Sequence, residues 1–486
     1  MLLGLYLLIL CAGLALIATS RRLWFDELVS WYVTLQEGPG GVLRALLGGA
    51  DTLPPIDYWI RQASISLFAE STLAFRLPSI LAYAFGLLCL WSFARRRVSA
   101  AVAWMAALVP LATASLYYAT EGRPYATLLF LQALSLLAWQ RAVEDPKSRL
   151  WPLALFVSLG AAPLTHYFGV LNYLPVIGGE ALRSLRAGGV SKRMVLPIGL
   201  ALLPLALLPL FAQHALEMRE AFWARGYGLM RPIDSYRFLL GDILQPVLLL
   251  MALGIVLALR GGPEEPPERA GFRAHELFAI FIQVSTPLVV LIMAIAYTNA
   301  MTHRYAIITC FGFALLSAHT VDRLERRIPR LVPLLLTVLL FWSGRQLFLA
   351  MEQAGDHDEQ ADLEASLAGA KLPVVVDNPQ LFLQSYHYLP TASSDRLFYL
   401  SDREESRRRL GYDNDEIAIE NLGVWVPLKN ERFDAFTLRE REFLVLADHP
   451  RGWLLARLTD ENAELQLISR IGRLEVFHAS LDSVGD

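Results

Sequence analysis

Residues 21–27 read Arg21-Arg22-Leu23-Trp24-Phe25-Asp26-Glu27 and follow directly on the apolar run of residues 2–20. Paired acids therefore stand where a membrane helix would leave the bilayer. Because a charged side chain at bilayer depth costs several kcal/mol, such acids either face water or line a polar site. The apolar run lacks a basic segment before it and a small-x-small cleavage site, which favours a retained first helix over a signal peptide.

The composition of the whole chain supports the membrane interpretation. Of 486 residues, 55% are hydrophobic and 18% charged, and the mean hydropathy is +0.41. These values exclude an ordinary soluble enzyme, and the net charge of −3 gives no reason to expect a nucleic-acid partner. We predict a mainly α, polytopic membrane protein with about eleven spans. The spans are placed near 2–19, 74–93, 99–118, 123–140, 150–166, 168–182, 194–212, 242–260, 275–297, 305–321 and 330–349.

Five short basic loops alternate with less basic ones, and this alternation predicts the orientation of the chain. Under the positive-inside rule the basic loops and the N-terminus are cytoplasmic, and the C-terminal region lies outside. Asp26, Glu121, His166, Trp223 and residues 303–305 then share the external side. The basic residues concerned are Arg95, Arg96, Arg97, Arg141, Lys147, Arg149, Arg183, Arg186, Lys192, Arg193, Arg260, Arg269, Arg273, Arg323, Arg326, Arg327 and Arg330.

The sequence divides by composition into a membrane domain, 1–350, and a soluble external domain, 351–486. The first external loop, about 20–73, contains segments 28–33 and 56–68 at roughly helical spacing, which predict short interfacial helices. The external domain carries strand-like runs separated by helix-compatible segments such as 402–410, which predicts a small α/β fold. The strand-like runs are 372–376, 396–400, 443–446 and 474–477. Within this domain, Asp377 and Asn378 follow a strand at a turn and could contact a substrate, but a strand-to-helix cap is the better explanation.

Several other stretches have more than one interpretation. Glu121 near a helix start is explained by the helix dipole, worth about 0.3–1 kcal/mol, but Arg123 at the same end makes more sense with an anion to bind. His166 could be a hydrogen-bonded structural residue, and Arg304 could reach to the interface. The external stretch 213–241, with Arg219, Phe222, Trp223, Arg225, Tyr227, Arg231 and Arg237, suits an interfacial helix or part of a substrate groove. Segment 261–268 and the acids Asp356, Asp358 and Glu359 have the composition of linkers.

Taken together, several of these stretches resemble bacterial GT-C glycosyltransferases of the protein-mannosyltransferase and aminoarabinose-transferase type (glycosyltransferase family 39). The resemblance covers residues 1 to about 350. One departure is visible, because similar proteins commonly have His before the Pro54-Pro55 pair and an apolar residue two after it, where this chain has Leu53 and Asp57. The stretches are Trp24-Phe25-Asp26-Glu27, Leu53-Pro54-Pro55-Ile56-Asp57-Tyr58-Trp59, Phe75-Arg76-Leu77-Pro78-Ser79, Glu121-Gly122-Arg123-Pro124-Tyr125-Ala126, Thr165-His166-Tyr167-Phe168-Gly169 and Arg304-Tyr305.

The resemblance implies an inverting glycosyltransferase of the bacterial cytoplasmic membrane that moves a sugar from a polyprenyl-phosphate donor to a lipid, protein or glycan acceptor at the outer face. Transfer needs a carboxylate base, for which Asp26 is the candidate, and Glu121, the second catalytic candidate, could share the base function or orient the acceptor. Arg123, Arg304 and His303 would stabilise the phosphate leaving group. The positions expected to bind substrate are Glu27, Asp57, Tyr58, Arg123, Tyr125, His166, Tyr167, His303, Arg304 and Tyr305.

No cofactor is required by this chemistry, although Asp26 and Glu121 could hold a divalent cation, Mg²⁺ or Mn²⁺, with the donor phosphate. Arg123 could supply the positive charge instead, and Glu27 could pair with Arg21 or Arg22 or cap the helix that follows it. A transporter or lipid-linked sugar flippase is the alternative class. Transporters often show internal repeats and polar residues near the bilayer midplane, and neither pattern stands out in this chain.

Overall fold

The computed structural model describes residues 2–218, 228, 230–259, 271–352, 363, 366–367, 371–448 and 452–481. Several predicted features lie outside these residues, namely Arg219, Phe222, Trp223, Arg225, Tyr227, Arg260, segment 261–268, Arg269, Asp356, Asp358 and Glu359. The chain divides into two compact units, each described here by itself. The helical unit comprises Met1–Ser20, Leu53–Ala212 and Gly226–Glu352, and the α/β unit comprises Arg21–Thr52, Gln213–Arg225 and Gln353–Asp486. The α/β unit thus includes the first half of the long first loop, a grouping that composition alone did not reveal.

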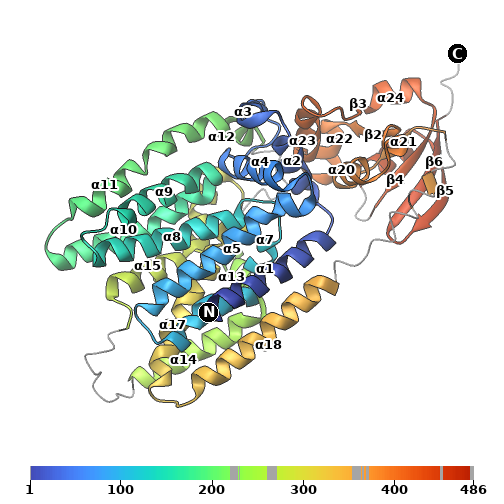
Figure 1. The fold of residues 1–486 in the computed structure, drawn as a ribbon. Helices are drawn as coiled ribbons and strands as arrows, with labels where there is room; N and C mark the ends of the chain where they lie inside the picture. The colour runs from blue at the N-terminus through green and yellow to red at the C-terminus, as the bar shows by residue number, and fades with distance from the viewer. Residues whose placement is uncertain are drawn as a thin grey trace. The chain divides into compact units, whose positions relative to one another are not determined.

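Helices of the helical unit run roughly along a common direction (Figure 1). Ser71 begins the longest of them, α5, by accepting a hydrogen bond from the Ala74 amide at 3.2 Å, as N-cap serines do. Tyr83, Trp139 and Phe311 are fully buried between the helices. The elements are α1 (Leu2–Ser20), α4 (Ile56–Phe68), α5 (Thr72–Arg95), α6 (Ala100–Leu108), η1 (Val109–Ala112), α7 (Ser115–Ala119), α8 (Tyr125–Glu144), α9 (Leu150–Thr165), η2 (Tyr167–Asn172), α10 (Tyr173–Ala187), α11 (Lys192–Leu200), η3 (Leu203–Leu207), α12 (Leu208–Glu217), α13 (Arg231–Leu240), η5 (Gly241–Ile243), α14 (Leu244–Leu259), α15 (Ala274–Val284), α16 (Thr286–Met293), η6 (Ala294–Thr298), η7 (His303–Ala306), α17 (Thr309–Glu325) and α18 (Leu331–Glu352).

All eleven predicted spans fall on helical segments, but fewer of them are long and apolar enough to cross a membrane unbroken. Within the described part of the chain, five helices meet this test, or up to seven if each of two bent helix pairs is one span. The shortfall arises because several predicted spans are short or interrupted. Span 99–118 is divided among α6, η1 and α7, where Pro110 lies in η1, and α9 has only 16 residues. The fold is mainly helical as predicted, and the number eleven stays a prediction.

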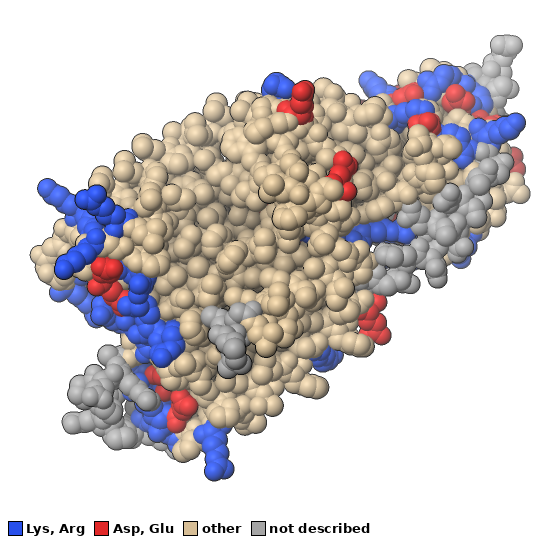
Figure 2. Space-filling view, in the orientation of Figure 1, with Lys and Arg blue, Asp and Glu red and all other residues tan. Residues whose placement is uncertain are grey.

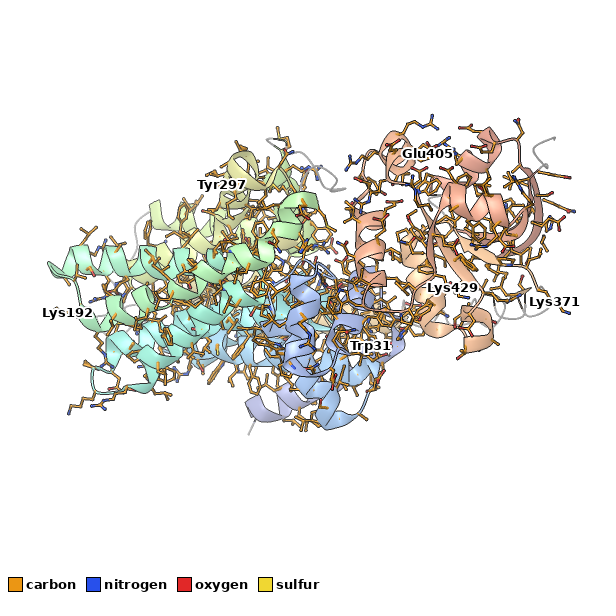
Figure 3. The ribbon with its side chains drawn as sticks, turned by 90° about the horizontal axis from the view of Figure 1, so that it is seen from above. Trp31, Lys192, Tyr297, Lys371, Glu405 and Lys429 are labelled. Atoms are coloured by element: carbon orange, nitrogen blue, oxygen red, sulfur yellow. The ribbon has the colours of Figure 1, made fainter. Side chains whose placement is uncertain are left out.

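Basic loops of the helical unit meet at one end of the bundle. Arg97 Nη2 lies 2.7 Å from Glu276 Oε1 and 2.5 Å from Glu144 Oε1. Arg193 Nη2 donates to the carbonyl of Asp145 at 3.1 Å. Figure 2 shows Lys and Arg side chains gathered at this end, with the middle of the visible face almost uncharged, and Figure 3 places Lys192 at its tip. The loops predicted to share one side of the membrane therefore share one end of the unit. The side that this end faces stays a prediction.

The α/β unit is built on a six-stranded mixed sheet with strand order β3-β2-β1-β4-β6-β5. β1 pairs in parallel with β2 and β4, β2 pairs in parallel with β3, and β6 pairs antiparallel with β4 and β5. The four predicted strands are all present, whereas β3 and β5 were not predicted. The strands are β1 (Val374–Val376), β2 (Leu397–Ser401), β3 (Asn430–Arg432), β4 (Glu442–Ala447), β5 (Glu464–Ile471) and β6 (Leu474–Ser480).

Hydrogen bonds at helix starts account for much of the local structure of this unit. Asn378 caps α20 through a bond from the Leu381 amide at 2.8 Å, and Asp402 caps α22 in the same way. Asp377 accepts from the Gly452 amide at 2.7 Å and the Leu454 amide at 3.2 Å, so the predicted structural role of residues 377 and 378 is confirmed. The helices are α2 (Phe25–Thr34), α3 (Gly38–Leu47), α20 (Pro379–Tyr388), α21 (Thr391–Ser394), α22 (Arg403–Leu410), α23 (Asn414–Gly423), α24 (Phe433–Arg439) and α25 (Leu454–Asp460).

Candidate functional site

In the helical unit, the short loop between α7 and α8 carries two predicted site residues. Glu121 is 1% exposed and Arg123 is 6% exposed, although such a short polar loop would ordinarily be expected at the surface. Pro124 ends the loop and precedes the first residue of α8, Tyr125, which suits a residue with fixed φ and no amide proton. Two ionisable side chains are thus held inside the protein by a five-residue connection.

His166 follows the last residue of α9 in an extended conformation and opens the turn into η2. Its Nδ1 accepts a hydrogen bond from the Phe168 amide at 3.1 Å, and its carbonyl accepts one from the Gly169 amide at 2.7 Å. A Cβ atom on Gly169 would lie 2.1 Å from the Ala162 carbonyl oxygen, so this close turn requires glycine. Because Nδ1 is an acceptor, the neutral ring carries its proton on Nε2.

The charge state of His166 follows from its surroundings. Burial, together with the positive charges of Arg123 and Arg304, holds the pKa of His166 well below its ordinary value. The ring is therefore a neutral hydrogen-bond donor at physiological pH. Arg123 and Arg304, which are far apart in sequence, both contribute to lowering this pKa.

Aromatic contacts join four predicted residues, Tyr125, His166, Arg304 and Tyr305. With Arg123, which is buried two residues before Tyr125, we call this group the arginine cluster. The Tyr125 ring centre is 5.4 Å from that of His166 and 5.7 Å from the Arg304 guanidinium carbon. The Tyr305 ring lies 6.1 Å from His166. Tyr305 also stacks on Phe168 at 4.0 Å, and the ring of Tyr167 is 6.5 Å from His166. The structure therefore brings together residues from three separate sequence stretches.

Asp57, in the first turn of α4, has both carboxylate oxygens in hydrogen bonds to other side chains. Arg61 Nε donates to Oδ2 at 2.6 Å, and Thr127 Oγ1 donates to Oδ1 at 3.1 Å. Arg61 was not singled out from the sequence, although its position four residues after Asp57 is the spacing at which helical side chains pair. Tyr58 beside it is 2% exposed. The predicted contact of Asp57 and Tyr58 with substrate stays a prediction.

His303 makes its described contacts with α13. Its Nδ1 lies 3.1 Å from Ser235 Oγ, and its ring stacks on Phe238 at 4.9 Å. Neighbouring residues in sequence, His303 and Arg304, thus have different surroundings, which their spacing alone could not reveal. The predicted contact of His303 with phosphate is not supported by these contacts and stays a prediction.

Asp26 and Glu27 belong to the α/β unit, in the first turn of α2. Glu27 is fully buried, and its Oε2 accepts from the Trp24 amide at 3.4 Å, as an acid that caps a helix start does. The segment before the helix is anchored to α20, because the Leu23 amide donates to Tyr388 Oη at 2.8 Å and Gln384 donates to the Leu23 carbonyl at 2.9 Å. Packing against the α/β unit therefore sets the position of Asp26.

Asp415, at the start of α23, shares this neighbourhood with Asp26 and was missed from the sequence. Burial and the negative charges of Glu416 and Asp26 raise the pKa of Asp415 to about 7. Two carboxylates thus interact in the unit that holds the candidate base. Among the described residues no group of three or more His, Cys, Asp or Glu side chains is arranged to hold a metal ion, and the expectation that no metal is required stays untested.

Comparisons with known proteins agree with this architecture. Residues 52–211 match the family model for dolichyl-phosphate-mannose-protein mannosyltransferase, and no curated protein sequence matches the chain. The fold is similar to ArnT from Cupriavidus metallidurans bound to undecaprenyl phosphate, with TM-score 0.59 and 13% identity over 98% of this chain and 97% of that one. It is also similar to the apo state of ArnT, with TM-score 0.60 and 12% identity over the same shares.

A weaker similarity is to the Archaeoglobus fulgidus oligosaccharyltransferase in complex with Zn and sulfate, with TM-score 0.46 and 12% identity over 90% of this chain and 68% of that one. The ArnT similarity extends over nearly the whole chain, and at these identities it establishes the fold. Through the matching family model over residues 52–211 and the ArnT-like fold, the resemblance of this chain to GT-C type glycosyltransferases is confirmed.

Proposed function

We propose that the protein is an inverting glycosyltransferase that moves a sugar from a polyprenyl-phosphate donor to an acceptor hydroxyl at the outer face of the cytoplasmic membrane. The observation that carries the proposal is that the Tyr125 ring lies 5.4 Å from the His166 ring and 5.7 Å from the Arg304 guanidinium carbon, with the buried Arg123 two residues before Tyr125. Guanidinium groups bind phosphate oxygens through charge-assisted, often bidentate hydrogen bonds. A phosphate at this position could also accept a hydrogen bond from His166 Nε2–H. The ArnT structure of similar fold was solved with undecaprenyl phosphate, which supports a polyprenyl phosphate as that anion.

In the proposed reaction, the acceptor oxygen forms a bond to the anomeric carbon while the bond from that carbon to the phosphate oxygen breaks. The proton of the acceptor hydroxyl passes to a carboxylate, for which Asp26 is our candidate, and the polyprenyl phosphate leaves with one more negative charge. Arg123, Arg304 and the Nε2–H of His166 would stabilise that charge in surroundings partly shielded from water. Glu121 is our candidate for orienting the acceptor or assisting Asp26.

The donor half of the proposal is tested with Arg304→Ala, measuring binding of undecaprenyl phosphate to the purified protein. One charge-assisted hydrogen bond contributes about 1.5–3 kcal/mol, so we expect affinity to fall about 10- to 150-fold. Arg345→Ala is the matched control, because Arg345 also lies against an aromatic ring, that of Trp342, at 5.6 Å. Equal affinity losses in the two variants, or a loss in Arg304→Ala explained by a lowered melting temperature, would contradict the proposal.

Transfer itself is tested by sugar release from a labelled polyprenyl-phosphate sugar in membranes that hold the acceptor. Envelope glycans lost when the protein is deleted would identify both the sugar and the acceptor. We expect Asp26→Asn to retain undecaprenyl-phosphate binding and the wild-type melting temperature while losing transfer by about 10²- to 10⁴-fold, the contribution of a general base. Unchanged transfer in this variant would remove Asp26 as the base, and movement of the lipid across the bilayer without transfer would favour a flippase.

A further inference from the structure

The geometry points to Arg61, Asp57 and Ser79 as a buried clamp that positions the backbone of the loop bearing Glu121 and Arg123. The inference rests on the proposed function in one respect, namely that this loop serves a donor phosphate. All three residues belong to the helical unit. We describe them as positioning residues, because Arg61 and Ser79 hold backbone carbonyls of this loop and Asp57 holds Arg61.

Arg61 is the centre of the clamp, and its side chain is fully buried. Beyond Asp57, its guanidinium donates to the Phe75 carbonyl at 2.7 Å, to Ser79 Oγ at 3.0 Å and to the Arg123 carbonyl at 2.9 Å. A planar guanidinium presents its donors in a rigid fork, so several acceptors can be held at fixed angles. One side chain thereby connects α4, α5 and the loop between α7 and α8.

Ser79 of α5 completes the connection. Its hydroxyl accepts from Arg61 and donates to the Glu121 carbonyl at 2.6 Å. The carbonyls of Glu121 and Arg123, two residues apart, are therefore both held from one side. Buried backbone carbonyls need a partner, and holding two of them in a connection this short leaves little freedom in the directions of the 121 and 123 side chains.

Asp57 makes the clamp electrically neutral. Its carboxylate pairs with Arg61 and is itself held by Thr127 of α8. The positive field offered to an anion then comes from Arg123 and Arg304, while the buried charge of Arg61 is compensated within the clamp. The arrangement therefore supplies rigidity without adding net charge, which is what a phosphate site with its own cations requires.

Ser79→Ala tests the clamp, with Ser64→Ala as matched control. Ser64 Oγ also donates to a backbone carbonyl of α5, that of Ala74, at 2.6 Å. Both hydroxyls are buried, and each donates one hydrogen bond of 2.6 Å to a backbone carbonyl of another segment. Because Ser79 also accepts from Arg61, we expect a somewhat lower melting temperature in Ser79→Ala, and faster amide hydrogen exchange in the peptide covering residues 119–125 only in that variant. Undecaprenyl phosphate should bind about fivefold more weakly to Ser79→Ala than to Ser64→Ala, the effect of one lost hydrogen bond transmitted to the site.

Arg61→Lys provides a second variant, since it retains the charge and loses the planar fork, and it should also speed exchange at 119–125. The outcomes separate the clamp from the proposed function. Unaltered exchange at 119–125 in Ser79→Ala, or an equal change in Ser64→Ala, would overturn the clamp. If the wild-type protein binds no undecaprenyl phosphate, the proposed function fails, while the exchange data still decide whether the clamp exists.

Discussion

Asp415 allows a quantitative test of the neighbourhood around the candidate base. Its pKa is raised from 3.8 to about 7 by burial and by the charges of Glu416 and Asp26. Tyr399 of β2 and Tyr412 are also titratable groups close to it, and the side-chain Nδ2 of Asn414 donates to its Oδ1 at 2.6 Å. The folded protein therefore binds the Asp415 proton more tightly than the unfolded chain does.

The sign of the effect follows from this difference. Between pH 3.8 and about 7, the unfolded carboxyl loses its proton while the folded one keeps it, so stability falls as pH rises and the full cost is present above pH 7. A pKa of Asp415 raised this far corresponds to a loss of about 4 kcal/mol in the free energy of unfolding. Because Asp415 is only half-buried, solvent screening reduces this to about 1–2 kcal/mol.

Asp415→Asn removes the titration while retaining the shape of the side chain. We expect this variant to be more stable than the wild type by about 1–2 kcal/mol at pH 8 and by less than about half of that at pH 5. Unfolding of the α/β unit in urea, read by pulse proteolysis of the full-length protein, would measure both values. Asp434→Asn is the control, because Asp434 occupies the first turn of α24 as Asp415 does in α23 and has a 65% exposed side chain. A stabilisation that is the same at both pH values, or equal in Asp434→Asn, would refute the reasoning.

Three further results are expected. Asp57→Asn should destabilise the helical unit by about 3 kcal/mol or more, because it leaves the buried Arg61 cation without its counter-charge; a loss under about 1 kcal/mol in thermal unfolding would show that the pair is not buried as described. Asp26→Asn should lower the pKa of Asp415, since one of the charges that raises it is removed. An unchanged pKa of Asp415, measured by carbon-13 NMR, would show that the two carboxylates do not interact. Transfer should survive exhaustive chelation with EDTA, because the two arginines of the cluster supply positive charge; activity lost to EDTA and restored by Mg²⁺ or Mn²⁺ would instead show that a cation is required.

Much of the fold could be predicted because its signals are local. Apolar segments long enough for a bilayer mark helices whatever their partners, and short continuous apolar runs bounded by turns mark buried strands. The strands at 374–376 and 442–447 were found in this way. β3 was missed because its three residues, Asn430–Arg432, include no apolar side chain, and it becomes a strand by pairing with β2. β5 was missed because its alternation of Leu465 and Leu467 breaks at Ile468, where its pairing with β6 also has a register shift.

The same distinction, between signals local to one segment and contacts made only in the folded chain, explains which site residues could be predicted. Residue types and their order along the chain were enough to single out Glu121, Arg123, His166 and Arg304, because charged and polar side chains next to membrane helices are costly and therefore informative. Only the tertiary structure could separate Arg304, near His166, from its neighbour His303, against α13. It alone revealed that Arg61 holds the loop of Glu121 and that Asp26 shares its surroundings with Asp415. The physical reason is that the length and apolar character of a segment are properties of that segment alone, whereas the stabilisation of a buried charge depends on partners that come from distant parts of the chain.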